Sequence, residues 1–190
     1  MDKNYILGLQ KHICEILQTF MSISDIPHYL NNASMSLWVL AYKDESYDLL
    51  SKKNNKKMSY YGETIIKSLF GSYLYDNYPD IEESDCTNIM VIKNSKKAQL
   101  KYAKKLGMFN YIRYGNSVKD IDEIYIECFR SFFAALEITS NKNKSFSMCM
   151  NFFKIIYKDD FTDINVNMSL MMDPKTGVMQ ILNIINSSNT

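Results

Sequence analysis

The chain has 190 residues, of which 46% are hydrophobic, and its 22 basic and 21 acidic residues give a net charge of +1. This length fits one domain with a short appendage, and the hydrophobic content excludes a disordered chain. The near-neutral charge excludes a generally basic surface, so any contact with nucleic acid must come from local patches.

The counts of glycine, proline and cysteine indicate the fold class and the cellular compartment. Six glycines and three prolines are few for a loop-rich β protein, which favours an all-α fold. The four cysteines (Cys14, Cys86, Cys128 and Cys149) are scattered, so we interpret them as reduced thiols of a cytoplasmic protein. No run is apolar enough to span a membrane, and the first residues lack the pattern of a signal or transit peptide.

Two helices are predicted in the first 42 residues. Apolar residues recur at helical spacing over residues 5–21, and a short buried helix is expected over residues 33–42. Neither His12 nor His28 has a second ligand four residues on, so we place both at the surface or in a cap, not in a metal site.

A long central helix is predicted after the basic connector Ser51–Lys57. Its apolar residues recur at helical spacing as far as Leu74, and Pro79 cannot continue it. Ser59 and Glu63 are four residues apart, so they share one face.

Four further features are predicted beyond Pro79. A helix opens near Glu82–Thr87 with Ser84 or Asp85 as N-cap, and another runs over residues 96–106 until Gly107 stops it. The last two helices are expected over residues 124–138 and 146–157, joined by a polar loop.

Several ordered motifs resemble the ribonuclease III family. Asn55 to Glu63 matches the spacing of the signature Asn-Glu-Arg-Leu-Glu-Phe-Leu-Gly-Asp and keeps its aromatic residue, its glycine and its last acid. Residues 41–47 resemble Ala-Phe-Thr-His-x-Ser-Tyr, and residues 106–115 resemble Leu-Gly-Leu-x-x-Tyr-Ile-x-x-Gly. Residues 124–136 resemble the family's second acidic helix. The resemblance implies an all-α, ribonuclease III-like helical endonuclease domain.

The same resemblance suggests three regions. Residues 1–29 are an N-terminal helical extension, residues 30–157 the ribonuclease III-like domain, and residues 158–190 a linker and terminal helix. Within the last region, residues 173–182 resemble the start of a double-stranded-RNA-binding domain, with Pro174 at a helix start. A lone terminal helix docked on the body is the alternative.

In that family, four carboxylates on two facing helices hold magnesium, which clamps the attacking and leaving oxygens of a phosphodiester. The matching positions here are Ser59, Glu63, Glu127 and Arg130, and Lys56 replaces a further acid of the signature. Since Arg130 always carries a positive charge, we expect no bound metal, with Glu63 and Glu127 as ligands if there is any. Arg130 is instead predicted to bridge these two carboxylates.

Two alternatives stay open for these residues. An active, magnesium-dependent endonuclease could complete its metal shell from Asp122, Glu123 or Glu137. Alternatively, Glu63 and Arg130 form an ordinary salt bridge between helices of another fold.

Basic and aromatic residues suggest partners. Four lysines at helical spacing (Lys93, Lys97, Lys101 and Lys104), together with Lys56 and Lys57 near the signature, suit the phosphates of A-form RNA, although a solvated helix face gives the same pattern. Ribonuclease III domains pair as two-fold dimers, so the resemblance implies a homodimer or heterodimer with contacts from Met58, Tyr60 and Tyr61. The predicted function is therefore a dimeric subunit that binds double-stranded or structured RNA, without metal-dependent cleavage and without a cofactor.

Overall fold

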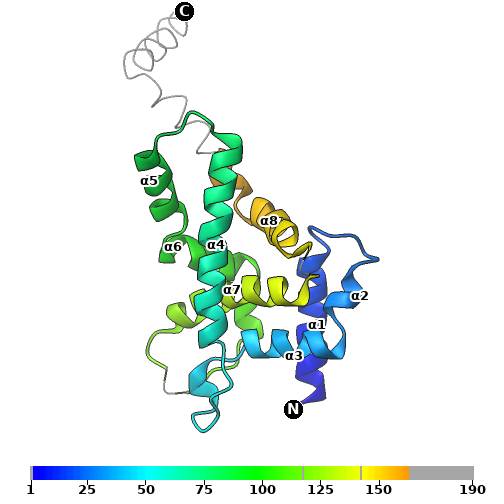
Figure 1. The fold of residues 1–190 in the computed structure, drawn as a ribbon. Coiled ribbons are helices and arrows are strands. Elements are labelled where there is room, and N and C mark those ends of the chain that lie inside the picture. Colours follow the sequence, from blue (N-terminus) through cyan, green and yellow to red (C-terminus); the bar gives the residue numbers. More distant parts are fainter. Residues whose placement is uncertain (1, 117, 142, 163–190) are drawn as a thin grey trace, which may run out of the picture. The chain divides into compact units, whose positions relative to one another are not determined.

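The computed structural model describes residues 2–116, 118–141 and 143–162, and its regular structure is helical (Figure 1). The only extended pairing among these residues is an isolated bridge between Lys43 and Arg113, so the all-α prediction is confirmed. The elements are α1 (Lys3–Leu17), α2 (Ile26–Tyr29), α3 (Asn32–Ala41), η1 (Glu45–Tyr47), α4 (Lys56–Asn77), α5 (Glu83–Lys93), α6 (Lys96–Lys105), η2 (Met108–Asn110), α7 (Ile121–Thr139) and α8 (Ser145–Ile156).

The chain divides into two compact units, Met1–Ile155 and Ile156–Thr190. Residues 158–162, predicted as the start of a linker, are helical in the second unit. The segment over residues 173–182 that resembles a double-stranded-RNA-binding domain lies outside the described residues. No helix in the described part of the chain combines the length and the apolar character needed to cross a membrane.

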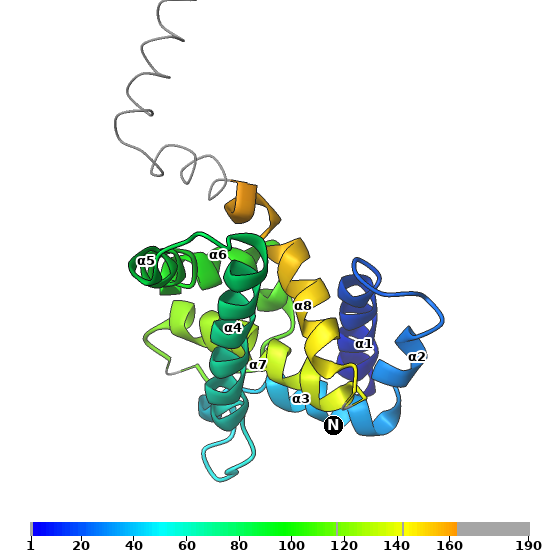
Figure 2. The ribbon, with the colours of Figure 1, turned by 45° about the horizontal axis from the view of Figure 1, so that its top comes forward.

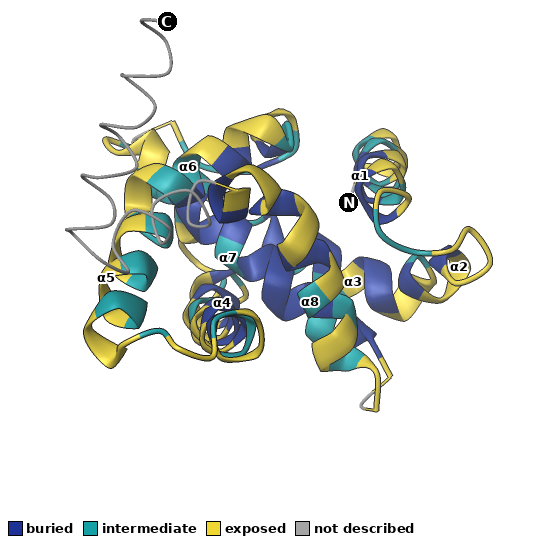
Figure 3. Cartoon of the chain, turned by 90° about the horizontal axis from the view of Figure 1, so that it is seen from above, coloured by how far each residue is buried: buried dark blue, intermediate teal, exposed yellow. Residues whose placement is uncertain are grey.

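The core of the first unit forms around α7, which packs against α3, α4 and α6 (Figures 1 and 2). Phe129, Phe132 and Phe133 of α7 are fully buried, and most of this helix lies in the interior (Figure 3). Trp38 of α3 and Phe152 of α8 each place a ring centroid 4.9 Å from that of Phe132. Dense packing on several sides therefore holds α7 in place against α4.

Two helix starts differ from the predictions. The Asp120 side chain accepts a hydrogen bond from the Glu123 backbone N–H at 3.1 Å, so α7 begins at Ile121 and not at residue 124. The residue before α5 is Glu82, in extended conformation, so the predicted N-cap at Ser84 or Asp85 is wrong.

The ends of the helices follow the predictions more closely. Gly107 adopts a φ of 67° just after α6, as expected for a glycine that ends a helix. The α4 helix ends at Asn77, two residues before Pro79. In contrast, α1 ends at Leu17 and not at residue 21.

Candidate functional site

The two helices that carry the predicted site, α4 and α7, meet backbone to backbone at Gly62. A Cβ atom at this position would lie 1.7 Å from the carbonyl oxygen of Arg130, so only glycine allows the approach. Glu63 directly follows this glycine and therefore lies beside Arg130, with the buried Ser59 one turn earlier on α4.

Arg130 is held by two partners. Its Nη1 lies 3.2 Å from Oε2 of Glu63, and its Nε donates to Oε1 of Gln99 at 2.7 Å. Gln99 of α6 is fully buried, and its amide in turn donates to the backbone and side-chain oxygens of Asn94. The guanidinium is therefore fixed in a site that the neighbouring helix α6 helps to build.

Lys56, the first residue of α4, occupies the other half of the site. Its Nζ lies 2.6 Å from Oε1 of Glu127 and 3.3 Å from Oε1 of Glu45. The predicted bridge from Arg130 to Glu127 is thus wrong. Lys56 lies two helical turns before Glu63, so it faces Glu127 directly while the arginine is engaged by Glu63 and Gln99.

The two carboxylates differ in electrostatic environment. A hydrogen bond from Lys67 and the charge of Arg130 hold the pKa of Glu63 below its usual value, against the effect of burial. Burial raises the pKa of Glu127, although Lys56 partly offsets it. One oxygen of Glu127, Oε2, is buried without a hydrogen-bond partner in the described structure.

The charge of Lys56 itself is stabilised. Burial alone would lower the pKa of this ammonium group, but its hydrogen bond to Glu127 and the charges of Glu127 and Glu45 raise it overall. Lys56 therefore stays protonated at neutral pH and keeps its positive charge beside Glu127.

The donor set does not fit magnesium, which requires near-octahedral oxygen ligands. Each carboxylate of the site is already paired with a base, and Ser59 adds only a neutral hydroxyl. Over the described ranges, no three His, Cys, Asp or Glu side chains are grouped so that they could hold a metal ion.

The alternative acids lie elsewhere. Asp122 and Glu123 belong to the first turn of α7, not to the segment before it, and pair with Lys104 at 3.2 Å and Lys96 at 2.6 Å. Glu137 lies in the last turn of the same helix, near Tyr61. These three acids therefore do not join Glu63 and Glu127 in one cluster.

The predicted stripe of four lysines is divided between two helices. Lys93 lies in the last turn of α5, whereas Lys97, Lys101 and Lys104 lie on α6 after an intervening turn. Since Asn94 and Ser95 between these helices are not helical, the spacing of Lys93 does not continue the face of α6.

The lysines proposed for RNA differ in availability. Lys56 and Lys104 are paired with carboxylates within 3.3 Å. Lys57 at the start of α4 and Lys97 on α6 are exposed. These two lysines are therefore the best placed of the predicted set to meet a phosphate.

The three residues predicted for a dimer contact differ in how far they are exposed. Met58 is 7% exposed and belongs to the core, so it is not accessible to a partner chain. Tyr60 is 78% exposed and Tyr61 is 42% exposed, so both present aromatic surface.

Sequence reasoning missed the residues that complete the ion pairs. Lys56 was assigned to RNA, and Gln99 and Glu45 were not singled out because they are distant in sequence from their partners. The Lys67–Glu63 pair, 3.0 Å long and four residues apart on α4, was recognisable from its helical spacing.

No family model matches the chain, but the chain is similar to curated proteins named Ribonuclease 3. It is 21% identical over 159 residues to the protein from Clostridium botulinum (strain Eklund 17B / Type B) and 20% identical over 156 residues to that from Clostridium perfringens (strain 13 / Type A). The matches cover 81% and 80% of this chain, but 66% and 64% of those relatives, just under two thirds of their length.

The fold of this chain is also similar to that of solved structures. The nuclease domain of Ribonuclease III from Campylobacter jejuni, described for flexibility in the region involved in its dimer formation, matches with a TM-score of 0.59 and 14% identity. That match covers 70% of this chain and 96% of the other. A second structure of the same nuclease domain matches with a TM-score of 0.55 and 16% identity, over 63% of this chain and 83% of the other. The predicted helical nuclease-domain fold is thereby confirmed.

Proposed function

Because this chain belongs to the ribonuclease III family and has the fold of its nuclease domain, we propose that it binds double-stranded or structured RNA without cutting it. In this role it serves as a dimeric RNA-binding or scaffold subunit.

The observation that carries the proposal is a base against each remaining carboxylate. Lys56 lies 2.6 Å from Glu127, and Arg130 lies 3.2 Å from Glu63. At ~4 Å and an effective dielectric constant of ~20, a unit charge pair is worth about 4 kcal/mol, so each base opposes a divalent ion by about 8 kcal/mol. Each base therefore cancels the attraction of its carboxylate for magnesium, so the site lacks the net negative charge that the family pattern supplies.

The ion pairs offer an alternative way to connect the helices. In the family, metal ligation links the two acidic helices; here Lys56–Glu127 and Arg130–Glu63 join α4 to α7 directly. Only 10% of the Glu127 side chain and 14% of the Arg130 side chain are exposed, so these pairs are screened less than surface pairs. The scaffold can therefore keep its shape without metal.

Exposed lysines support RNA as the ligand. A-form RNA is recognised through its shape and its phosphates, which suits lysines placed on rigid helices. Lys57 and Lys97 are exposed on α4 and α6, the helices that also supply Lys56 and Gln99 to the ion-paired site. An RNA duplex bound to Lys57 and Lys97 would approach a site whose carboxylate charges are balanced by Lys56 and Arg130.

Dimer formation is supported by Tyr60, which exposes 78% of its surface on α4. An exposed aromatic residue on a rigid helix is suited to an isologous contact. Native mass spectrometry of the chain alone would distinguish a homodimer from a subunit that requires another family member.

Cleavage and binding of a labelled RNA duplex test the proposal together. We expect the unmodified chain to bind the duplex with an affinity that falls steeply between 50 and 200 mM salt, as about two or more phosphate contacts require. No cleavage is expected with magnesium or manganese. Lys57→Gln with Lys97→Gln should weaken binding, whereas Glu15→Gln on α1 should not.

The active alternative is tested in the same assay. Ser59→Glu combined with Lys56→Glu and Arg130→Glu rebuilds an acidic site, and this variant should gain magnesium binding. Magnesium-dependent cleavage by the unmodified chain would overturn the proposal in favour of an active double-stranded-RNA endonuclease. A salt-independent affinity, or no binding of RNA, would remove RNA as the ligand.

A further inference from the structure

A small pocket lies between α4, α7 and α8; Figures 1 and 2 show α4 crossing α7, with α8 next to both helices. Its volume is about 190 Å³, and its lining consists of Tyr61, Thr64, Ile65, Ser68, Glu137, Phe146 and Cys149. Glu137 lies ten residues beyond Glu127 on α7, which places the pocket roughly 15 Å along the helix from the ion-paired site.

Among the lining residues, Glu137 is the only Asp, Glu, Lys, Arg or His, and no salt bridge to it forms within the described part of the chain. Its Oε2 is buried without a hydrogen-bond partner in the described structure. Burial and a hydrogen bond between Tyr61 and Glu137 raise the pKa of Tyr61, so the tyrosine hydroxyl keeps its proton beside the carboxylate. This buried oxygen thus lacks a partner, and a ligand cation that displaces a neighbouring pocket side chain would satisfy it.

The helix itself adds to the negative potential. Glu137 lies in the last turn of α7, where the exposed carbonyl end of a helix favours a cation. That last turn contains no basic residue. A carboxylate at this end is unfavourable by itself, so the position gains from a cation supplied from outside.

The pocket walls suit the apolar part of such a ligand. Tyr61 and Phe146 are 42% and 45% exposed, so parts of both rings are open to the pocket and the solvent. The side chain of Ile65 is buried. Aromatic faces attract ammonium and guanidinium groups, and Ile65 can pack against methylene groups. Burial raises the pKa of Cys149, which therefore stays a neutral thiol.

We propose that this pocket binds the end of an unbranched alkyl chain that carries an ammonium or guanidinium group. Glu137 accepts from the cation, Tyr61 and Phe146 lie against it, and the methylene groups pack on Ile65. This chemistry occurs in the lysine or arginine side chains of a partner protein and in free polyamines. The site is separate from the RNA-binding function proposed above and does not depend on it.

The probes are n-butylammonium and n-butylguanidinium, with uncharged n-butanol as the matched control. Each is titrated into the ¹⁵N-labelled full chain and followed by NMR. Saturable shifts are expected in residues 61–68, 137 and 146–149 for both cations, and a single group of this size binds at about millimolar concentration. Butanol should bind at least about tenfold more weakly, because it lacks the charge-assisted hydrogen bond.

Glu137→Gln is the decisive variant, because it keeps the shape of the side chain and its contact with Tyr61. It should weaken cation binding at least about tenfold. Glu15→Gln, which changes an exposed carboxylate paired with Lys11 on α1, should have no effect. Thermal unfolding of both variants checks that they remain folded. Equal binding of butanol, unchanged affinity of Glu137→Gln, or no shift with either cation would overturn the proposal.

A second experiment distinguishes the two sources of the cation, a free polyamine and a side chain of a partner protein. Spermidine is compared with a short peptide that has blocked ends and a single lysine. Tighter binding of spermidine assigns the pocket to a free polyamine, and tighter binding of the peptide assigns it to a protein side chain. Either result supports the proposed chemistry.

Discussion

Lys56 shows how a single side chain changes the chemistry of this site. Its position in the signature corresponds to an acid in the family, yet it provides the counter-ion of Glu127. A buried carboxylate without such a partner is strongly destabilising, whereas a carboxylate beside a base is tolerated. The lysine therefore makes the retention of Glu127 compatible with a site that lacks other acids.

Lys56→Met tests this role. We expect the free energy of unfolding at pH 7 to fall by about 2 kcal/mol, below the range for a fully buried pair because the lysine side chain is 44% exposed. Urea unfolding measures the change. Lys53→Met, an exposed lysine in the preceding loop, is the control and should change the stability by less than about 0.5 kcal/mol.

The pH dependence of this variant has a defined sign. Burial already raises the pKa of Glu127, and loss of Lys56 raises it further, so the folded state binds a proton more readily than the unfolded state. The stability loss should therefore be larger at pH 8 than at pH 5. A second change, Glu127→Gln, should restore most of the stability; an equal loss at both pH values would contradict this account.

Among the helices, α4 depends on one glycine for its position against α7. A helix interior normally disfavours glycine, but the approach of the Arg130 carbonyl leaves no room for a Cβ at Gly62. The same helix carries Gly71, whose Cβ would meet no atom within 4 Å. Two glycines of one helix thus have opposite roles, one required by packing and one open to replacement.

Alanine substitutions at these two glycines form a matched pair. Gly62→Ala should lower the free energy of unfolding by more than about 3 kcal/mol, because the helices must separate and the ion pairs with them. Gly71→Ala should raise it by about 0.5–1 kcal/mol through better helix propensity. Urea unfolding followed by circular dichroism gives both values. Similar effects of the two substitutions would show that the α4–α7 contact is looser than described.

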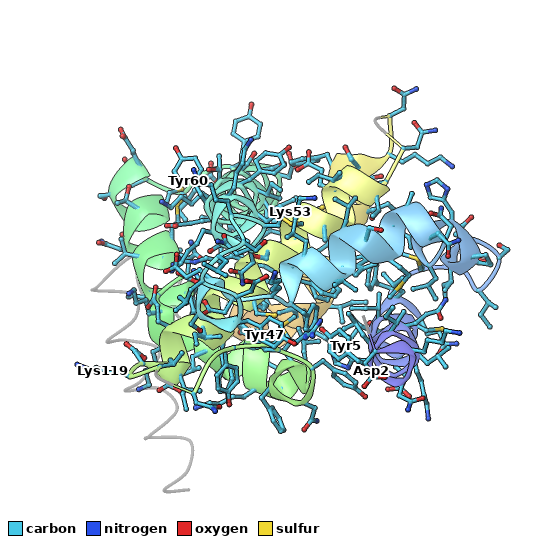
Figure 4. The ribbon with its side chains drawn as sticks, turned by 90° about the horizontal axis from the view of Figure 1, so that it is seen from below. Asp2, Tyr5, Tyr47, Lys53, Tyr60 and Lys119 are labelled. Carbon is cyan, nitrogen blue, oxygen red and sulfur yellow. The ribbon has the colours of Figure 1, made fainter. Side chains whose placement is uncertain are left out.

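Across the first unit as a whole, the N-terminal helix α1 is joined to the body by aromatic residues. His12 was predicted at the surface or in a cap, but it is 6% exposed, stacks on Tyr111 at 4.4 Å and lies 3.1 Å from the hydroxyl of Tyr42. Tyr5 donates to the Tyr111 carbonyl at 3.0 Å. The guanidinium carbon of Arg113 lies 4.7 Å from the ring centroid of Tyr5 and 4.1 Å from that of Tyr47; both tyrosines are labelled in Figure 4. The predicted N-terminal extension is therefore part of the packed unit.

Acid should weaken this unit through His12. Burial lowers the pKa of His12 to about 4, from an ordinary value near 6.5, so the unfolded state binds the proton more readily between these values. Stability from this group is complete above about pH 6.5 and is lost as the pH falls to about 4, by about 3 kcal/mol in total.

Urea unfolding between pH 4 and 7 measures this loss, and histidine NMR signals measure the titration directly, since the chain has only two histidines. His12→Asn should reduce the slope of stability against pH in this range. His28→Asn, at an exposed position on α2, is the control and should leave most of the slope intact. A His12 signal that titrates near pH 6.5 in the folded chain would contradict the prediction.

The sequence by itself determined the helical class, most helix bounds to within a few residues and the positions of Glu63, Glu127 and Arg130. These features depend on local spacing, which a single sequence displays directly. Only the tertiary structure decided which base meets which carboxylate, because Lys56 and Glu127 are 71 residues apart and meet through the crossing of α4 and α7. The burial of His12 and the free carboxylate oxygen of Glu137 likewise depend on contacts between helices, which local periodicity does not specify.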